Sequence, residues 1–307
     1  MGLAAFVLIL IGVIVSAVPY FKRVLAYNKW KNFHKLMGVF YMLGIAHSFF
    51  VENLIKELPL TRNYVLIMMI IGVAAWFYRA FLYRFFNKKM DYVVDNVLNL
   101  GHDISEITLR NTGDKLAFKA GQFAFISLPS LGTNEEHPFT LSSHPNENNL
   151  RISVKGLGDY TNNLSDKIKV GDKAKVEGPF GHFTIDHIKN NHQIWVAGGI
   201  GITPFLSLCK EIKSEKVKLF WSVNSKAEAV YAEELSSVAK QNPNLEFILW
   251  DTEKKGYVTA DNFDIDNFLE TSFLICGPNS LKDALSKQLK KHGVKQSQIH
   301  DEEFSFR

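Results

Sequence analysis

The chain has 307 residues, of which 47% are hydrophobic and 21% are charged, and this length allows about two domains. The formal net charge is only +4. Part of that charge comes from basic residues beside apolar segments, so it gives no sign of a nucleic-acid partner. The two cysteines, Cys209 and Cys276, are too few for a disulfide framework and favour a reducing compartment.

Three apolar segments near the amino terminus predict a transmembrane domain over 1–88, with helices at about 3–21, 33–52 and 63–85. A helix that spans a bilayer needs a run of about 20 mostly apolar residues. The first segment alone could also be a cleaved signal peptide. It lacks a basic start and a small-residue cleavage site, and two further apolar segments follow it closely. We therefore predict a multi-pass protein embedded in the lipid bilayer.

The charges of the loops predict the orientation of these segments, because cytoplasmic loops carry an excess of lysine and arginine. Basic residues gather between the first and second segments and again after the third. Between the second and third segments the basic residues are Lys56 and Arg62, and Glu52 and Glu57 offset their charge. The amino terminus and the loop over 53–61 are therefore expected outside, and everything after residue 85 is expected in the cytoplasm.

Short segments rich in β-branched and aromatic residues occupy 91–188, and clusters of Gly and Asn separate them. Such spacing is typical of an antiparallel β-barrel. The expected strands read HDISEITLRNT, GQFAFISLP, PFTLSS, LRISVKG and KAKVEGPFG.

Strands alternate with helical segments over 192–307, and this alternation predicts an α/β domain built on a parallel sheet. The chain is therefore expected to be a multi-domain membrane protein with a helical, a β-barrel and an α/β part. In the last part the expected strands read QIWVAGG, VKLFWSV, LEFILWD and TSFLICG, and the expected helices lie in GITPFLSLCKEIKS, AEAVYAEELSSVAK and NSLKDALSKQLKKHG, with a further helix starting near TADNFD.

The sequence VAGGIGITPF places three glycines between a strand and a helix, at Gly198, Gly199 and Gly201. Glycines at this place let the backbone approach the pyrophosphate of a dinucleotide and aim helix amides at it. Pro204 suits the first helical turn, and Thr203 is a good N-cap or phosphate donor. An ordinary tight turn has the same pattern, so this motif alone is weak.

A second glycine turn, at Cys276, Gly277 and Pro278, ends a later strand at the same edge of the expected sheet. Ligands of open α/β sheets bind outside the carboxyl ends of the strands, and two turns there strengthen the prediction of a dinucleotide. A small thiol beside a glycine lets a nicotinamide ring lie close. The alternative for Cys276 is a small buried apolar residue.

With these motifs in place, the chain resembles the ferredoxin–NADP reductase superfamily, and within it the ferric reductase and NADPH oxidase group. HPFTLSS resembles the flavin-binding strand of that group. The resemblance implies that His137 and Pro138 pack near the flavin ring system and that Thr140 hydrogen-bonds it. Thr140 and Cys276 are therefore the candidate catalytic residues.

The resemblance also implies the anchors of FAD. ISVKGLGDYTNNL is similar to the segment that holds the FAD pyrophosphate, and VEGPFG to the turn that closes the flavin barrel. A flavin needs a flat apolar slot, which Phe139 and the terminal aromatics could line, although each aromatic could equally belong to a core. The implied contacts of FAD are Lys155, Gly158, Tyr160, Thr161, Phe139, Phe304 and Phe306.

The choice between NADH and NADPH stays open in the sequence. Relatives that prefer NADPH usually carry an arginine shortly after the second strand of the parallel sheet. This chain has Asn224 near that place and Lys226 two residues on, and neither an arginine nor an acid is present to read the ribose. The expected substrate is therefore written NAD(P)H.

Two histidines of the membrane part, His34 and His47, are thirteen positions apart, in a segment similar to one helix of the ferric reductase transmembrane domain. The resemblance implies that they ligate two haem b groups about 20 Å apart along the helix. On a straight helix the two rings would point about 140° apart, so a local irregularity or a tilt is needed. The alternative is that the histidines ligate no haem and simply lie at the two edges of the membrane.

The sequence departs from this family in the number of membrane segments. The family has about six spans and a second histidine pair, whereas this chain offers three spans and one pair. It is a fragment, pairs with a second membrane subunit, or forms a homodimer. The resemblance implies electron transfer from NAD(P)H through FAD and haem to ferric iron or dioxygen. The alternatives are a haem-free NAD(P)H:flavin or quinone reductase and a non-catalytic nucleotide-binding subunit.

Overall fold

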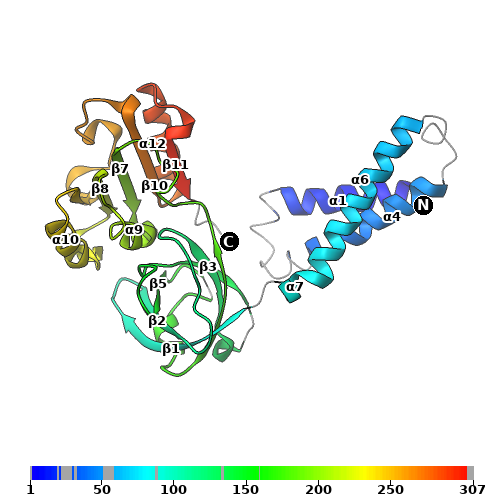
Figure 1. Cartoon of the computed structure of the whole chain (residues 1–307), viewed down its shortest axis with the longest axis horizontal. Helices are drawn as coiled ribbons and strands as arrows, with labels where there is room; N and C mark the ends of the chain where they lie inside the picture. The colour runs from blue at the N-terminus through cyan, green and yellow to red at the C-terminus, as the bar shows by residue number, and fades with distance from the viewer. Residues whose placement is uncertain are drawn as a thin grey trace. The chain divides into compact units, whose positions relative to one another are not determined.

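The computed structural model describes residues 2–18, 21, 30, 33–50, 59–86, 89–132, 135–158 and 160–302. The chain divides into two compact units, Met1–Lys88 and Lys89–Phe306. The first unit is drawn in blue and cyan in Figure 1 and consists of helices, whereas the second contains two β-sheets.

The helices of the first unit are apolar along most of their length. Helix α1 packs along α4, and α4 packs against α6. Within the described residues α1 and α4 are shorter than the helices expected over 3–21 and 33–52, and parts of those ranges lie outside the described residues. The helices are α1 (Gly2–Ala17), α4 (Met37–Phe50), α6 (Pro59–Phe77), the π-helix η1 (Tyr78–Leu82) and α7 (Tyr83–Phe86).

Glycines allow the helices of the first unit to approach closely. An alanine at Gly38 would drive its Cβ into the indole of Trp76 in α6, and one at Gly72 would collide with the ring of Tyr41 in α4. The Tyr41 hydroxyl also donates a hydrogen bond to the Met68 carbonyl, at 3.2 Å. Small residues at such crossings are typical of helix packing in membranes.

Among the described residues, a single helix is long and apolar enough to cross a membrane: Pro59–Leu82, with 24 residues. No residue of α6 is buried, and large side chains such as Ile70 are exposed to 66%. An exposed apolar surface of this size is typical of contact with lipid or a partner helix. The described parts of the other two expected spans are shorter than a bilayer requires.

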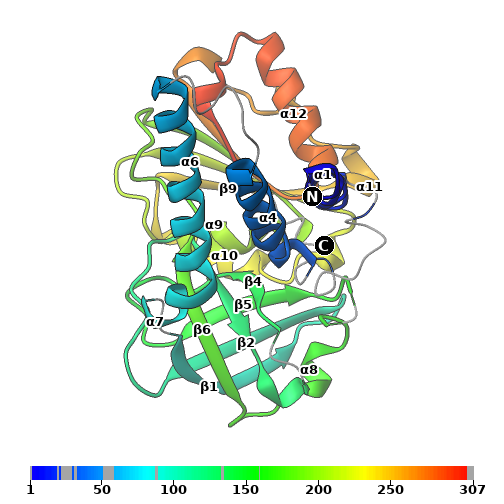
Figure 2. The same cartoon turned by 90° about the vertical axis from the view of Figure 1, so that its right-hand side faces the viewer.

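The second unit begins with a six-stranded antiparallel sheet in the order β4-β3-β6-β1-β2-β5. The sheet curls, because Leu141 after β4 bridges Ile152 in β5 and so joins the two edges. This arrangement, visible in the lower part of Figure 2, agrees with the expected antiparallel barrel in its coarser form, a curled sheet. The strands are β1 (Met90–Asn99), β2 (Ile104–Asn111), β3 (Phe123–Ser127), β4 (His137–Thr140), β5 (Leu150–Lys155) and β6 (Lys173–Phe180).

Alternation of side chains along these strands builds the core of the curled sheet. In β2, Ile107 and Leu109 are fully buried, whereas Thr108 between them is not. Successive side chains of a strand point to opposite faces, so every second apolar residue enters the interior. Tyr92, Ile126 and Val176 complete this core from other strands. A short helix, α8 (Leu164–Lys167), packs against β1 and β2.

A five-stranded parallel sheet in the order β11-β10-β7-β8-β9 forms the rest of the second unit. The predicted parallel sheet is thus observed, with one additional edge strand, β11. The helix expected over 201–214 ends at Leu208, and the one expected near Thr259 is only a 3-10 turn, Ala260–Asn262. The elements are β7 (His192–Gly198), α9 (Thr203–Leu208), β8 (Lys216–Val223), α10 (Ala232–Gln241), β9 (Leu245–Asp251), α11 (Thr252–Lys255), β10 (Thr271–Cys276), α12 (Asn279–Lys291) and β11 (Ile299–Glu302).

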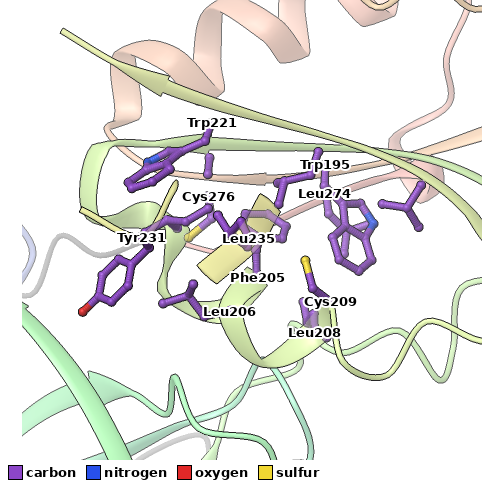
Figure 3. Packing of buried hydrophobic residues seen from close by; sticks show 14 of the residues in the cluster. Trp195, Phe205, Leu206, Leu208, Cys209, Trp221, Tyr231, Leu235, Leu274 and Cys276 are labelled. Atoms are coloured by element: carbon purple, nitrogen blue, oxygen red, sulfur yellow. The ribbon is translucent and has the colours of Figure 1, made fainter. Parts of the chain in front are cut away.

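Both faces of the parallel sheet are covered, so its strands are apolar on both sides. In β7, Trp195 belongs to the apolar cluster on one face, with Phe205 of α9 and Trp221 of β8. Its neighbour Val196 belongs to the cluster on the opposite face, with Leu285 of α12. Figure 3 shows the first of these clusters, in which α9 lies directly against the sheet.

Candidate functional site

The order of the parallel sheet defines where a ligand binds. The chain leads from β7 through β8 to β9 on one side and then returns to β10 and β11 on the other side of β7. In open sheets of this kind the crevice at the carboxyl ends of the two strands that flank the reversal is the ligand site. The reversal lies between β7 and β10, and the two glycine turns predicted from the sequence follow these two strands.

The structure places the two glycine turns in contact. A Cβ at Gly201 would collide with the carbonyl of Cys276, and a Cβ at Gly277 would lie 3.0 Å from the backbone of Gly198. Gly277 has φ of +154°, which disfavours other residues. A Cβ at Gly199, in contrast, would meet no atom within 4 Å. The backbone is therefore bare and accessible at Gly199, while its neighbours hold the two turns together.

Thr203 and Pro204 are both buried at the start of α9. Pro204 lies in the first turn of the helix, as expected. Thr203 is not the N-cap, because a 3-10 turn over Gly199–Ile202 leads directly into the helix. Its hydroxyl instead donates a hydrogen bond to the Ile200 carbonyl, at 3.2 Å, and so closes the glycine turn.

Cys276 ends β10 with its thiol inside the apolar cluster of Figure 3. The residue is 0% exposed. Burial raises the pKa of the Cys276 thiol well above its usual value, and the nearby Glu302 carboxyl adds to this effect. The thiol is therefore neutral, and its environment is that of the small buried residue considered as the alternative.

Glu302 is a residue of this site that the sequence analysis did not single out. It ends β11 opposite Cys276, and its Oε1 would lie 3.0 Å from a Cβ at Gly181. Its Oε2 is buried with no hydrogen-bond partner among the described residues. Burial raises the pKa of Glu302 to about 7, although Lys282 opposes this. The site thus contains a carboxyl group that can hold or release a proton near neutral pH.

Glu302 also lines an open cavity of about 290 Å³ at the edge of the sheet, together with three histidines. The rings of His187 and His300 lie 5.3 Å apart. Burial lowers the pKa of His300, and the neighbouring His187 lowers it further. This cavity gives water a route to the end of β11.

Strand β4 carries the expected flavin contacts. The Oγ1 of Thr140 is buried and has no hydrogen-bond partner among the described residues, which is costly unless a ligand supplies one. Phe139 is only 8% exposed and packs in the core of the curled sheet, so it is a core aromatic. His137 stacks on Tyr160 with ring centroids 3.8 Å apart, and Pro138 is paired with Phe125 of β3.

The segment after β5 forms a turn that exposes its backbone. The Thr161 hydroxyl accepts hydrogen bonds from the amides of Leu157 and Gly158, at 3.0 and 3.2 Å, and a Cβ at Gly158 would meet nothing within 4 Å. Burial raises the pKa of Tyr160 to about 12. Lys155 lies beside this turn and lines a small cavity with Gly199, so residues expected at the two cofactors share one space.

The two histidines of the first unit lie in different environments. The Nδ1 of His34 is 3.0 Å from the Ser16 hydroxyl of α1, and its ring stacks on Trp30. His47 lies in the last turn of α4. The helix is interrupted by a turn at Leu36, between the two histidines. The described residues hold no group of three or more His, Cys, Asp or Glu side chains placed for a metal.

Two glycines of the first unit and the terminal aromatics bear on the surroundings of a cofactor. Small residues such as Gly38 and Gly44 let a helix or a porphyrin come close. Gly38 is covered by Trp76, and a Cβ at Gly44 would lie 3.5 Å from Ile9 of α1, so neighbouring helices occupy both places. The aromatics Phe304 and Phe306, expected over the flavin, lie outside the described residues.

Comparison with known families agrees with this geometry. Residues 89–198 match the FAD-binding domain family, and residues 195–287 match the oxidoreductase NAD-binding domain family. The chain therefore carries both cofactor domains of the ferredoxin–NADP reductase-like oxidoreductases, the pair of domains on which NAD(P)H-dependent oxidoreductases are built. The resemblance to the NADPH oxidase group is confirmed by the relatives that it matches.

Among these relatives are Flavohemoprotein A of Dictyostelium discoideum, NADPH oxidase 1 of Mus musculus and dual oxidase 2 of Sus scrofa. They are 29%, 28% and 30% identical over 70%, 59% and 64% of this chain. The matched regions are 60%, 34% and 13% of the respective relatives. The chain thus spans less than two thirds of each of these proteins.

Solved structures show the same fold for the second unit. The flavohem-like FAD/NAD binding domain of a nitric oxide dioxygenase from Vibrio cholerae is 26% identical, with a TM-score of 0.61 over 69% of this chain and 97% of that one. The Amycolatopsis cytochrome P450 reductase GcoB is 22% identical, with a TM-score of 0.63 over 71% and 70%. Both likenesses cover about the length of the second unit.

Proposed function

We propose that the chain is a membrane oxidoreductase that passes electrons from cytoplasmic NAD(P)H through FAD to haem b, and on to ferric iron or dioxygen. It comprises a transmembrane domain over 1–88, an FAD-binding domain over 91–188 and an NAD(P)H-binding domain over 192–307. The observation that carries the proposal is the pair of touching glycine turns at the reversal of the parallel sheet. Packing of the two turns explains Gly201 and Gly277, and Gly199 leaves open backbone at the carboxyl end of β7, where ligands of such sheets bind.

On the nucleotide side, the protein binds and orients NAD(P)H. Gly198, Gly201 and Gly277 keep the two turns together, and Gly199 leaves room for the pyrophosphate. Cys276 has a small side chain that leaves room for the nicotinamide ring, and it does not react, because its neutral thiol is a poor nucleophile. Glu302 holds a proton near neutral pH at the end of the neighbouring strand.

On the flavin side, the Thr140 hydroxyl provides an unused hydrogen bond for the ring system. The backbone at Gly158, where a Cβ would meet nothing within 4 Å, and the charge of Lys155 would hold the pyrophosphate, and Phe304 and Phe306 remain candidates for covering the ring. When bound, FAD accepts a hydride and releases its electrons singly.

In the membrane part we propose three spans: Pro59–Leu82 is long and apolar enough to cross a membrane, and exposed apolar side chains also lie on α1 and α4. His34 and His47 would each hold one haem iron from one side. The Ser16 hydroxyl binds Nδ1 of His34 and thereby leaves Nε2 for the metal. Haem, when bound, carries single electrons across the membrane. Further ligands for the haems would have to come from another membrane subunit or a second copy, because the first 88 residues contain only these two histidines.

A haem-free NAD(P)H:flavin or quinone reductase is the second candidate. It is favoured by the neighbouring helices that cover Gly38 and Gly44, and by the presence of only two histidines in the first 88 residues. In that case electrons leave on the cytoplasmic side, and the helices only anchor the protein.

Absorbance of the purified full chain in detergent distinguishes these candidates. Haem gives a Soret band and α-bands that sharpen on reduction with dithionite, whereas flavin alone gives a yellow protein. With haem present, His47→Ala should abolish reduction of a membrane-impermeant acceptor on the outer face and leave NAD(P)H reduction of the flavin intact. Outer-face reduction that survives in His47→Ala refutes the relay, and absence of bound flavin refutes both candidates.

A further inference from the structure

A partly buried polar cluster joins the two halves of the second unit, the curled sheet and the parallel-sheet half. Arg151 of β5 donates two hydrogen bonds to Glu234 of α10, at 2.8 and 2.9 Å, and lies 3.6 Å from Glu106 of β2. The hydroxyl of Tyr231, just before α10, lies 3.0 Å from Glu106 and 2.6 Å from the Ser153 hydroxyl. We call these five residues the Arg151 cluster.

The Arg151 cluster contributes more to the relative orientation of the two halves than to the free energy of folding. The side chains of Arg151, Glu234 and Glu106 are only 17%, 28% and 12% exposed. Ion pairs that are largely withdrawn from water return little net free energy after the cost of desolvation, but two parallel hydrogen bonds fix the direction of the guanidinium tightly. Burial alone would lower the pKa of Arg151, yet the hydrogen bonds and charge of Glu234, with the charge of Glu106, raise it.

A chain of contacts leads from this cluster to the nucleotide turn. Tyr231 has its ring against Trp221, with centroids 6.4 Å apart, and its hydroxyl points out of the apolar cluster in Figure 3. The Trp221 indole N–H donates a hydrogen bond to the Gly199 carbonyl, at 2.8 Å. Tyr231, Trp221 and Gly199 line one cavity together with Lys155 of β5. A shift of the Arg151 cluster therefore displaces the wall of the site itself.

We propose that Arg151 is a positioning residue that sets the separation between the flavin and the nicotinamide by locking the curled sheet to α10. The proposal rests on the proposed transfer of hydride from NAD(P)H to FAD. Such a transfer requires the two reacting atoms to lie about 3–3.5 Å apart, and a misplacement of about 1 Å costs on the order of 100-fold in rate. The two rings are held by different halves of the unit, so the junction controls that distance.

Rapid-mixing kinetics on the full chain test the functional part. Arg151→Gln should lower the rate constant of flavin reduction at saturating NAD(P)H by about 10- to 100-fold, with flavin content and nucleotide KM nearly unchanged. Glu234→Gln should give a similar loss, and the double variant should be little worse than either single one, because the residues act as a unit. Arg110→Gln is the matched control, since Arg110 pairs with Asp95 on the exposed side of the same sheet.

Distances between spin labels test the junction without relying on activity. Val170 and Tyr257 lie on different halves and are 67% and 83% exposed. Cysteines introduced there can be labelled selectively, because the native Cys209 and Cys276 are buried with raised thiol pKa values. In flavin-free full chain, Arg151→Gln should broaden the distance distribution relative to the parent and to Arg110→Gln.

A distribution as narrow as that of the parent overturns the proposal, and so does an unchanged rate constant in Arg151→Gln. If neither NADH nor NADPH reduces the flavin of the parent protein, the proposed function fails instead. The distance distributions then decide by themselves whether Arg151 holds the two halves together.

Discussion

The protonation of Glu302 gives the sharpest prediction for stability. Its pKa rises from 4.5 in an unfolded chain to about 7 in the folded protein, chiefly through burial. Because the folded state keeps its proton where the unfolded state has lost it, Glu302 destabilises the protein increasingly as pH rises from about 4.5 to 7. One pKa unit is worth about 1.36 kcal/mol, so the penalty at pH 8 approaches about 3 kcal/mol as an upper limit.

Glu302→Gln removes this penalty while preserving the size of the side chain. Unfolding of the flavin-free protein in detergent by denaturant, followed through the fluorescence of the buried Trp195 and Trp221, gives the free energy at pH 5 and at pH 8. The variant should gain up to about 2.5 kcal/mol relative to the parent between these pH values, because part of the penalty is already present at pH 5. Asp264→Asn serves as control, because that carboxyl is fully exposed. An advantage of Glu302→Gln that is the same at both pH values refutes the reasoning.

Three further substitutions test the site. Gly201→Ala forces a methyl group against the Cys276 carbonyl and should lower the free energy of unfolding by about 1–3 kcal/mol. It should also raise the KM for NAD(P)H. The control Gly113→Ala should change neither quantity, because nothing lies within 4 Å of the new Cβ. Thr140→Val should weaken FAD binding by about 5- to 10-fold in a titration of the flavin-free protein, yet leave that protein as stable or more so, because the hydroxyl has no partner there. Glu228→Gln, in the cavity beside Gly199, removes a charge that repels a 2′-phosphate and should raise the kcat/KM ratio of NADPH to NADH by about 5-fold.

The strands of the parallel sheet could be predicted because their apolar runs are continuous. β7, β8 and β10 are buried on both faces, and each is bounded by polar or turn residues. β11 was missed because its sequence, IHDE, is polar and short, and it becomes a strand only by pairing with β10. Helix α9 was predicted too long, since an apolar Ile212 extends the helical pattern beyond Leu208, where the helix ends.

The glycine turns and Thr140 could be found in the sequence because short motifs surround them. Glu302 could not, because an acid two residues from an expected aromatic carries no sign of burial. Its raised pKa depends on the fold around it. The Arg151 cluster was hidden for the same reason: Arg151 and Glu234 are 83 positions apart, and no local pattern links them.

The second unit closes its own interior. The core of the curled sheet begins with residues of β1, and the buried members of the two clusters of the parallel sheet begin at Ala120, so among the described residues these clusters take no side chain from before Lys89. A module that is finished in this way can be fused behind unrelated front ends without redesign.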